Sequence, residues 1–303
     1  MGSDEDRMIH HLLIDSRRLD AAEQTLFFAL VSQRNDGHKY IDDLYQNGVR
    51  AFVVSKMPEE IHPDACYIHV QDVLKALQQL AAYHRSQFDI PVIGITGSNG
   101  KTIVKEWLSQ LFGPDYNIVR SPKSYNSQVG VPLSVWRMDS THQLGIFEAG
   151  ISKPDEMTAL QKIIKPTIGI FTNIGQAHEE NFISFMQKAG EKLNLFAQAE
   201  TLVYCMDYYD IQQVILRAGL GEKMQLIPWS QKFKEAEAYV ESVEKQERDT
   251  LLRLVFKGET HQFAIPFNDD ASIENAIHCI VLCLFMKMPA NVLADRLRGL
   301  TSI

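Results

Sequence analysis

The sequence predicts an α/β fold: a small α/β N-terminal domain, then a mainly parallel sheet with helices on both faces and an antiparallel edge. Strand-like and helix-like segments alternate from residue 92 to residue 228, which is typical of parallel sheets built from βαβ units. A glycine-rich loop of the P-loop type joins the first of these strands to its helix. Residues 236–265 then alternate between apolar and polar side chains, which predicts an antiparallel meander extending the sheet.

The N-terminal residues form a separate block in the predicted fold. Short apolar runs predict strands at 12–14, 25–30 and 51–54. From Val70 to Ala81, apolar residues recur with the spacing of a helix that buries one face, and the pattern ends near Phe88. The expected hinge is Asp89-Ile90-Pro91. We therefore expect two domains, residues 1–88 and 89–303.

The second block continues the alternation to the end of the chain. Strands are predicted at 92–96, 116–120, 144–149, 167–173, 201–205 and 225–228. Helices are predicted at 102–112, 155–164, 184–199, 208–218, 272–288 and 290–299. In a parallel sheet of this kind, ligands bind at the carboxyl ends of the strands. The candidate site residues are therefore sought in the segments that follow each strand.

Composition excludes several classes of function. Hydrophobic residues make up 45% and charged residues 22% of the 303 positions, as in an ordinary globular protein. The net charge of −8 provides no basic surface for nucleic acid or an anionic membrane. No apolar run approaches the ~20 residues of a membrane span, and no signal peptide is evident. The four cysteines include no Cys-x-x-Cys pair, so we expect a reducing, cytoplasmic location.

The stretch from Val92 to Thr102, Val-Ile-Gly-Ile-Thr-Gly-Ser-Asn-Gly-Lys-Thr, is the most informative segment. Backbone N–H groups of a glycine-rich loop can surround a phosphate, and the next helix contributes its positive N-terminus. Lys101 adds a positive charge for the β- and γ-phosphates, and the Thr102 hydroxyl can bind Mg²⁺. Ile95 stands where the common pattern has its first glycine. The alternative is a chance Gly-Lys-Thr in a turn, which the flanking strand and helix patterns disfavour.

Two further strands end in groups suited to a metal-nucleotide. Glu148 ends an apolar strand about fifty residues after Lys101, where nucleotide hydrolases carry a Mg²⁺-binding acid. His178 follows the strand that ends near Asn173, which gives it a possible place beside the metal. The alternatives are a surface carboxylate and an ordinary hydrogen-bonded histidine. A phosphate-binding loop in the same sheet favours the metal interpretation, above all for Glu148.

Two other features were weighed for ligand binding. The polar loop at residues 121–132 follows a predicted strand, and such loops commonly bind substrate, although an ordinary connection is the alternative. Lys188 and Lys192 lie one helical turn apart, so they share a face of their helix. Taken alone, this pair predicts a solvated helix face.

Together these segments resemble the Mur ligases, the ATP-dependent ligases of peptidoglycan synthesis. The resemblance rests on Asp15-Ser16-Arg17, Leu26-Phe27-Phe28-Ala29-Leu30, Asn35-Asp36-Gly37-His38, Gly94 to Thr102, Tyr125 to Leu133, Glu148 to Met157, and Thr172 to His178. The sequences of these motifs are most similar to those of Bacteroidetes-type forms, in which the ligase is fused ahead of an alanine racemase domain. The loop alone would not separate Mur ligases from folylpolyglutamate synthases.

The resemblance implies a role for each matching residue. Ser16 and Arg17 would lie in the domain that holds the UDP end of the substrate, and Asn126 and Ser127 would face the UDP-sugar. ATP would be bound by Gly97, Ser98, Asn99, Gly100, Lys101, Thr102 and, near the adenine, Asn275. Thr102, Glu148, His178 and Lys192 would support Mg²⁺, with Lys192 matching the lysine that is carbamylated in the family. Lys101, Lys192 and His178 would be the catalytic residues.

The implied reaction joins two substrates at the expense of ATP. A carboxylate of UDP-N-acetylmuramoyl-tripeptide takes the γ-phosphate of ATP to give an acyl phosphate, and the amine of D-alanyl-D-alanine then displaces phosphate. Positioning and electrostatics carry such a reaction, so the protein needs no nucleophilic side chain.

The chain departs from the family pattern in two places. Family members carry a third, C-terminal domain of the Rossmann type, whereas this chain stops at Ile303, so we expect an incomplete ligase with low or no activity alone. Ala271 and Ser272 stand where the family has a His-Asn pair, which puts adenine contacts in question.

Parts of the sequence are also compatible with two other functions. A folylpolyglutamate-synthase-like ligase shares the loop, but Asp15-Ser16-Arg17 argues for a UDP-binding block. A non-catalytic module that binds a nucleotide or UDP-sugar is disfavoured because it would not need five matching groups at once: Lys101, Thr102, Glu148, His178 and Lys192.

Overall fold

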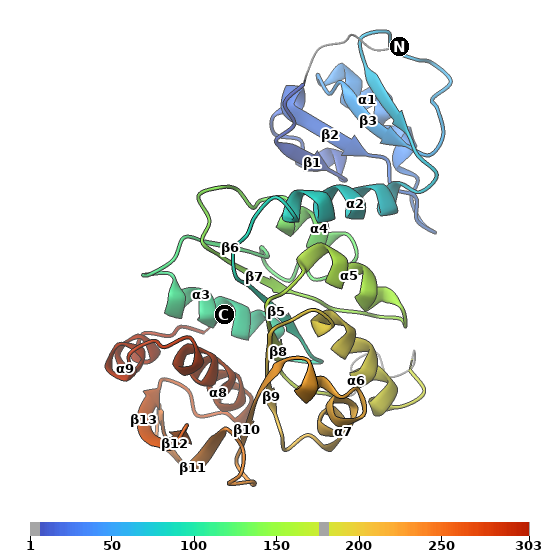
Figure 1. The fold of residues 1–303 in the computed structure, drawn as a ribbon. Helices are drawn as coiled ribbons and strands as arrows, with labels where there is room; N and C mark the ends of the chain where they lie inside the picture. The colour runs from blue at the N-terminus through green and yellow to red at the C-terminus, as the bar shows by residue number, and fades with distance from the viewer. Residues whose placement is uncertain (1–6, 176–181, 303) are drawn as a thin grey trace. The chain divides into compact units, whose positions relative to one another are not determined.

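The computed structural model describes residues 7–175 and 182–302. The chain divides into two compact units, Met1–Tyr83 and His84–Ile303, and each unit contains its own sheet (Figure 1). The division falls inside one helix, so His84 and Arg85 at the end of that helix belong to the second unit. Within the described part of the chain, none of the helices has the length and apolar character needed to cross a membrane.

The first unit is built on a four-stranded parallel sheet. Its strands lie in sequence order, β1 (His11–Leu13), β2 (Thr25–Phe28), β3 (Ala51–Val54) and β4 (Cys66–His69). The helices are η1 (Ser16–Arg18), η2 (Ala22–Gln24), η3 (Gly37–Tyr40), α1 (Ile41–Gln46) and α2 (Val73–Arg85). Sequence reasoning missed β4 because this strand is short and mostly exposed, so no apolar run or alternation marks it.

The segment Asn35-Asp36-Gly37-His38 has a structural explanation within the first unit. A Cβ atom on Gly37 would lie 2.9 Å from the backbone of Ala29, so only glycine fits at this close approach. The His38 Nε2 accepts hydrogen bonds from the backbone N–H groups of Ser55 (3.0 Å) and Lys56 (3.2 Å). The segment therefore ties the turn after β2 to the end of β3.

The second unit contains a nine-stranded sheet in the order β13-β12-β11-β10-β9-β8-β5-β7-β6. The strands are β5 (Val92–Thr96), β6 (Ile118–Arg120), β7 (Leu144–Glu148), β8 (Ile168–Phe171), β9 (Thr201–Cys205), β10 (Gln225–Ser230), β11 (Ala238–Lys245), β12 (Thr250–Phe256) and β13 (Glu259–Ile265). The helices are α3 (Lys101–Phe112), α4 (Gly130–Val135), α5 (Glu156–Ile164), α6 (Phe185–Leu193), η5 (Asn194–Phe196), α7 (Tyr209–Arg217), η6 (Leu220–Glu222), α8 (Asp270–Phe285) and α9 (Ala290–Arg298).

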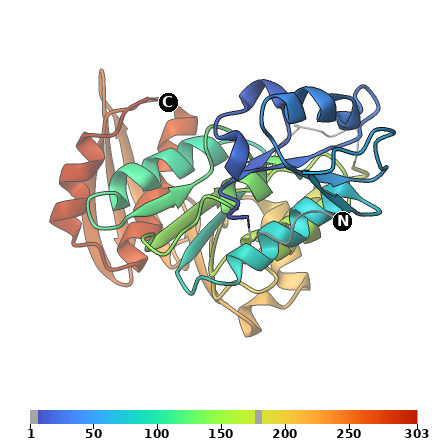
Figure 2. The ribbon, with the colours of Figure 1, turned by 90° about the horizontal axis from the view of Figure 1, so that it is seen from above.

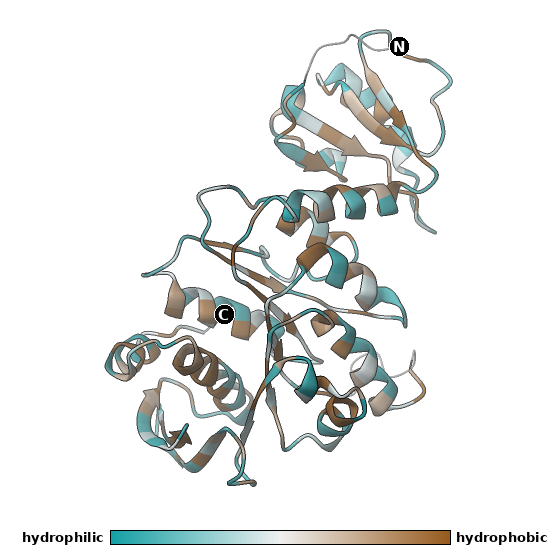
Figure 3. Ribbon diagram, viewed as in Figure 1, coloured by the Kyte–Doolittle hydropathy of each residue, from teal (hydrophilic) through white to brown (hydrophobic). Residues whose placement is uncertain are grey.

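Helices cover both faces of this sheet, as the sequence predicts. Helix α3 packs with α8 and α9 on one face, and α5, α6 and α7 lie on the other (Figure 1). The strands β11 to β13 lie beside the red helices α8 and α9 in both views (Figures 1 and 2). Helix α8 is brown along much of its length in Figure 3, which marks its residues as mostly hydrophobic, and ten of its residues are buried.

The antiparallel edge predicted from residues 236–265 is confirmed. Strands β11 and β12 pair in antiparallel fashion, as do β12 and β13, and β11 joins the parallel strands through two residue pairs with β10. The central strand β5 lies between β7 and β8 and is parallel to both. The chain order therefore reverses across β5, and the carboxyl end of that strand is where a sheet of this topology offers a binding crevice.

Candidate active site

The loop from Gly97 to Gly100 leaves β5 in a conformation that only glycine permits at two positions. Gly97 has φ of 150° and Gly100 has φ of 80°. A Cβ atom would lie 1.9 Å from the Thr172 hydroxyl oxygen at Gly97, and 2.1 Å from the Asn275 Oδ1 at Gly100. Gly100 is the N-cap of α3, and the first N–H groups of a helix have no partner within it. The loop therefore holds its backbone close to neighbouring residues and directs free N–H groups toward an anion.

Two lysine ammonium groups meet at the carbonyl oxygen of Gly97. The Lys101 Nζ lies 2.9 Å from this oxygen and 3.2 Å from the carbonyl of Ser98. The Lys192 Nζ reaches the same Gly97 oxygen at 3.0 Å from α6. Burial lowers the pKa of Lys101 below its usual range. The Lys101 ammonium lies beside the N-terminus of α3, which is the arrangement expected of a phosphate site, and the Lys192 side chain lies next to it.

The prediction of a solvated face for Lys188 and Lys192 is wrong. Both residues are buried, with 2% and 3% of their surface exposed. The Lys188 ammonium donates a hydrogen bond to the carbonyl of Gly175, so both lysines of the pair bind backbone carbonyls at strand ends. Burial, together with the charges of Lys101 and Lys188, lowers the pKa of Lys192 to about 7. A large share of Lys192 is therefore a neutral amine near neutral pH.

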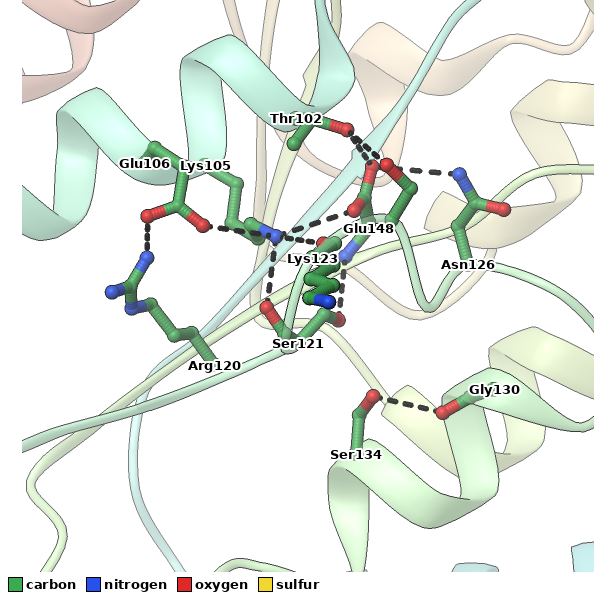
Figure 4. A network of polar contacts seen from close by, with 11 residues as sticks. Thr102, Lys105, Glu106, Arg120, Ser121, Lys123, Asn126, Gly130, Ser134 and Glu148 are labelled. Atoms are coloured by element: carbon green, nitrogen blue, oxygen red, sulfur yellow. Dashed lines mark hydrogen bonds and ion pairs between the residues drawn. The ribbon is translucent and has the colours of Figure 1, made fainter. Parts of the chain in front are cut away.

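Glu148 lies at the end of β7 and is fully buried. Its Oε2 accepts a hydrogen bond from the Thr102 hydroxyl at 2.9 Å and lies 3.5 Å from the Asn126 Nδ2, as Figure 4 shows. Its Oε1 lies 3.3 Å from the Nζ of Lys105, a lysine that sequence reasoning did not single out. The two predicted Mg²⁺ groups, Thr102 and Glu148, are thus in direct contact.

The segment after β8 forms hydrogen bonds with the glycine-rich loop. The Thr172 hydroxyl donates to the carbonyl of Asn99 at 2.6 Å. Asn173 accepts two backbone N–H groups, that of Ser98 on its carbonyl and that of Asn99 on its Oδ1, both at 2.9 Å. The Ser98 hydroxyl in turn accepts from the N–H of Gly175 at 2.9 Å. Ser98 and Asn99 therefore hold the loop in place, which leaves the N–H groups at the start of α3 for a ligand.

Helix α8 contributes three side chains that sequence reasoning mostly missed. Asn275, the predicted adenine residue, lies against Gly100. Glu274 accepts from the Tyr208 hydroxyl at 2.9 Å and lies 3.3 Å from the Asn173 Nδ2. His278 lies one turn further along and is fully buried. Glu274 and His278 could not be found from local patterns, because their partners are 49 to 106 residues away in the chain.

The two ring nitrogens of His278 have distinct partners. Because the indole N–H of Trp229 can only donate, the Nδ1 that it contacts at 3.0 Å must accept. The Nε2 then carries the proton and donates it to the carbonyl of Thr172 at 2.9 Å. Burial lowers the pKa of His278 to about 4, which keeps the ring neutral. The ring therefore links the sheet to the residue that supports Asn99.

A cavity opens at the carboxyl edge beside these groups. Its lining includes Gly97, Ser98, Lys101, Asn126, Ser127 and Lys192. Asn126 faces Glu148, whereas the Ser127 hydroxyl accepts a hydrogen bond from the N–H of Gly130, the first residue of α4. Two of the predicted substrate residues, Asn126 and Ser127, therefore share one cavity with predicted phosphate-binding residues. His178 lies outside the described residues.

The two candidate residues of the first unit lie at the carboxyl edge of its own sheet. Ser16 and Arg17 follow β1 in η1. Arg17 makes a two-pronged ion pair with Asp15, through Nε at 2.9 Å and Nη2 at 2.8 Å. This guanidinium holds the pKa of Asp15 at about 2. The Arg17 side chain is 85% exposed, so it is available to an anionic ligand.

The second unit can therefore bind a triphosphate and a metal at one edge. Among the described residues, no group of three or more His, Cys, Asp or Glu side chains could form a metal site. The hydroxyl and carboxylate oxygens of Thr102 and Glu148 suit Mg²⁺, which binds through one or two carboxylates together with substrate phosphates. The residues present fit a magnesium-nucleotide.

Comparison with known proteins places the chain in a family. Residues 95–283 match the Mur ligase middle domain, and residues 8–85 match the profile described as Mur ligase family, catalytic domain. The UDP-N-acetylmuramoyl-tripeptide–D-alanyl-D-alanine ligase of Bacillus subtilis (strain 168) is 27% identical over 305 residues, which cover 98% of this chain and 63% of that protein. The chain thus spans less than two thirds of the length of this relative.

Solved structures share the fold. A crystal structure of MurF from Acinetobacter baumannii matches with a TM-score of 0.87 at 21% identity, covering 97% of this chain and 64% of that one. The MurF ligase of Thermotoga maritima in complex with ADP matches with a TM-score of 0.85 at 20% identity, covering 99% and 68%.

Proposed function

Because the chain belongs to the Mur ligase family, we propose that it is the part of an ATP-dependent ligase that binds ATP and a UDP-linked substrate. The reaction joins D-alanyl-D-alanine to UDP-N-acetylmuramoyl-tripeptide in peptidoglycan precursor synthesis. The observation that carries this proposal is the meeting of Lys101, Lys192, Thr102 and Glu148 around the glycine-rich loop. The Bacillus relative bears the name of this activity and matches nearly the whole chain.

ATP is the nucleotide that the loop best suits. The N–H groups at the start of α3 and the Lys101 ammonium would bind the β- and γ-phosphates. Gly97, Ser98, Asn99 and Gly100 would shape the loop around them, and Asn275 would lie on the adenine side. The Thermotoga MurF ligase, which shares this fold, is described in complex with ADP.

Mg²⁺ would be held by Thr102 and Glu148, together with His178 and a carbamate on Lys192. When bound, the metal would neutralise the charge that builds up between the phosphates and the attacking carboxylate. Thr102 and Glu148 already touch at 2.9 Å, so their oxygens form one face of such a site.

The environment of Lys192 favours carbamylation. A carbamate forms when a neutral amine attacks CO₂ and releases a proton, and the lowered pKa of about 7 supplies that neutral amine. The product carries an anionic oxygen pair where the ammonium would repel Mg²⁺. After exposure to ¹³C-bicarbonate, a carbamate signal in the ¹³C NMR spectrum should disappear in Lys192→Arg and remain in Lys188→Arg. Absence of the signal in the unmodified protein would contradict the carbamate.

The residues of the chain would serve this reaction by binding and orientation. Lys101 would stabilise negative charge on the γ-phosphate as the terminal carboxylate of the tripeptide attacks it. Attack forms the acyl phosphate and releases ADP, after which the amine of D-alanyl-D-alanine attacks the acyl carbon and phosphate leaves. Asn126 and Ser127, which line the same cavity as Lys101 and Lys192, would orient the sugar-linked substrate.

The domain roles follow the two sheets. We propose residues 1–88 as the domain for the UDP end, with Ser16 and Arg17 contacting it, and residues 89–303 as the ATP-binding domain. The proposal includes a cytoplasmic location, where ATP and UDP-sugars are found. It also includes an alanine racemase domain fused to the full-length protein, which the mass of the native protein would test.

The alternative, a folylpolyglutamate-synthase-like ligase, predicts a folate in place of the UDP-linked tripeptide as the substrate that brings the carboxylate. Calorimetric titration with UDP-N-acetylmuramoyl-tripeptide should give saturable binding that weakens in Arg17→Ala, because Arg17 would lose its contact with the diphosphate. Lys162→Ala, which removes an exposed lysine on α5, provides the control. Binding of a folate in place of the UDP substrate would overturn the proposed substrate while leaving ATP binding intact.

A further inference from the structure

Lys105 is a completely buried lysine on α3, one turn after Lys101 and Thr102. The ligase reaction proposed above gives it no role. Burying an ammonium group without partners is costly, so a lysine in this position needs good acceptors on every side. Its partners therefore indicate what it is there to hold.

The Lys105 ammonium contacts three separate parts of the second unit (Figure 4). On the carboxyl edge it lies 3.3 Å from the Oε1 of Glu148. In the loop after β6 it donates hydrogen bonds to two backbone carbonyls, that of Ser121 at 2.8 Å and that of Lys123. On its own helix it lies 3.2 Å from the Oε1 of Glu106. One charged group thus joins α3, the end of β7 and the 121–126 loop.

The contact with Lys105 divides the two oxygens of Glu148. Lys105 occupies the Oε1, while the Oε2 faces the Thr102 hydroxyl and the Asn126 amide. A carboxylate with one oxygen held by a buried ammonium cannot rotate freely, so the second oxygen keeps its direction. That direction is toward the hydroxyl with which Glu148 would share the metal.

The same ammonium holds the loop that carries the proposed substrate residues. Lys123 has a positive φ of 49°, a left-handed conformation that is unfavourable for a non-glycine residue. This conformation accompanies a bend in which the carbonyls of Ser121 and Lys123 both reach Lys105. Beyond the bend, the Ser124 hydroxyl lies 3.3 Å from that of Thr102, and Asn126 faces Glu148.

We propose that Lys105 is a positioning residue that fixes the metal-facing oxygen of Glu148 and the 121–126 loop through one ammonium group. This inference rests on the proposed function, since it assumes that Glu148 serves a magnesium-nucleotide. It goes beyond that function because Lys105 would touch neither the nucleotide nor the substrate. It would instead align the groups that bind each of them.

The test compares the affinity for ADP with and without Mg²⁺, by calorimetry on the full chain. The N–H groups of α3 and Lys101 bind phosphate in either condition, so the ratio of the two dissociation constants isolates the contribution of the metal. We call this ratio, the factor by which Mg²⁺ tightens ADP binding, the Mg²⁺ enhancement. Lys105→Met should reduce the Mg²⁺ enhancement about tenfold. The affinity for ADP without Mg²⁺ should stay within about twofold of that of the unmodified chain. Lys105→Gln should do the same and, because it retains an N–H donor for the loop carbonyls, serves if the methionine variant fails to fold.

Arg120→Gln provides the matched control. Arg120 pairs with Glu106 on the outer side of the same network, away from Glu148, so its loss should leave the Mg²⁺ enhancement unchanged. A lower melting temperature with an unchanged enhancement in the Lys105 variants would mean a merely structural role and overturn the proposal. A larger enhancement would mean that Lys105 only opposes the metal by its charge, which also overturns it.

The proposed function fails separately. If the unmodified chain binds no ADP, or binds it equally well after Lys101→Ala, the phosphate site itself is wrong. The Lys105 proposal is contradicted only where the unmodified chain shows Mg²⁺-enhanced binding that the Lys105 variants retain.

Discussion

In the first unit the charged residues at the carboxyl edge of the sheet are exposed and bind each other, whereas in the second unit they are buried and bind backbone carbonyls. Arg17 is 85% exposed and pairs with Asp15, while Lys105 and Lys192 have at most 3% of their surface exposed. Breaking an exposed ion pair costs little free energy, so Arg17 can exchange Asp15 for a ligand. The second arrangement requires the surrounding chain to position every acceptor. The difference predicts a rigid edge in the second unit and an edge in the first unit whose side chains can rearrange around a ligand.

The largest effect is expected from a side chain added where the glycine-rich loop leaves no room for one. Gly97→Ala should lower the affinity for Mg-ADP about 1,000-fold, or ~4 kcal/mol. The added Cβ would lie 1.9 Å from the Thr172 hydroxyl oxygen at a positive φ, so the loop must move. Calorimetry provides the measurement. Gly219→Ala is the control, because Gly219 also has a positive φ but no atom within 4 Å of its Cβ position. Equal effects of the two variants would contradict the account.

A second test uses the buried histidine behind the loop. The folded-state pKa of His278 is about 4, below the value of 6.5 for a free histidine. The unfolded chain therefore takes up a proton that the folded chain refuses, and stability falls as pH drops from above 6.5 to about 4. The loss from this group is about 3 kcal/mol. Urea unfolding at several pH values should show this slope, and His278→Gln should flatten it. An unchanged slope in the variant would assign the pH dependence to other groups.

A smaller effect is expected from the support that Tyr208 gives to Glu274. Tyr208→Phe removes the hydroxyl that donates to Glu274 at 2.9 Å, and Glu274 in turn contacts the Asn173 amide. Loss of one such hydrogen bond amounts to about 1 kcal/mol, so the affinity for Mg-ADP should fall about fivefold. Tyr209→Phe is a close control, since the next tyrosine is 69% exposed. Identical affinities in the two variants would mean that Glu274 on α8 does not help to hold the glycine-rich loop in its binding conformation.

The smallest effect on stability is expected at the edge of the first unit. Arg17→Ala should leave the midpoint of thermal unfolding unchanged, because the ion pair with Asp15 is exposed to solvent. The affinity for UDP-N-acetylmuramoyl-tripeptide should nevertheless fall about tenfold. Differential scanning calorimetry and titration on the same samples separate the two quantities. A large drop in melting temperature would show that this edge is as rigid as the other.

Much of the fold could be predicted from local sequence patterns. Alternating apolar runs and helical spacing located β5, α3 and the antiparallel strands, because each of these elements buries a continuous face. Strand β4 was missed because it is short and mostly exposed. The order of strands across the sheet could not be read from spacing alone, since it depends on which distant segments pair.

The candidate site was predicted unevenly for a related reason. Lys101, Thr102 and Glu148 belong to motifs that lie within a few residues of a strand end. Lys105 sits among apolar positions of an amphipathic helix, and a lysine there is normally solvated. Its burial depends on carbonyls 16 and 18 residues away and on a carboxylate 43 residues away. The family resemblance identified Lys192, but its burial likewise depends on an acceptor 95 residues away in the chain. Long-range acceptors of this kind leave no local signal.

Titration of the full chain with Mg-ADP, compared with Lys101→Ala and Lys162→Ala, tests the central claim most directly. The claim is that the buried edge of the second sheet binds nucleotide phosphates through Lys101 and the start of α3. We predict saturable binding that falls at least about 100-fold in Lys101→Ala and stays unchanged in Lys162→Ala, whose lysine is exposed on α5. Equal binding by all three proteins, or no binding by the unmodified chain, would contradict the claim.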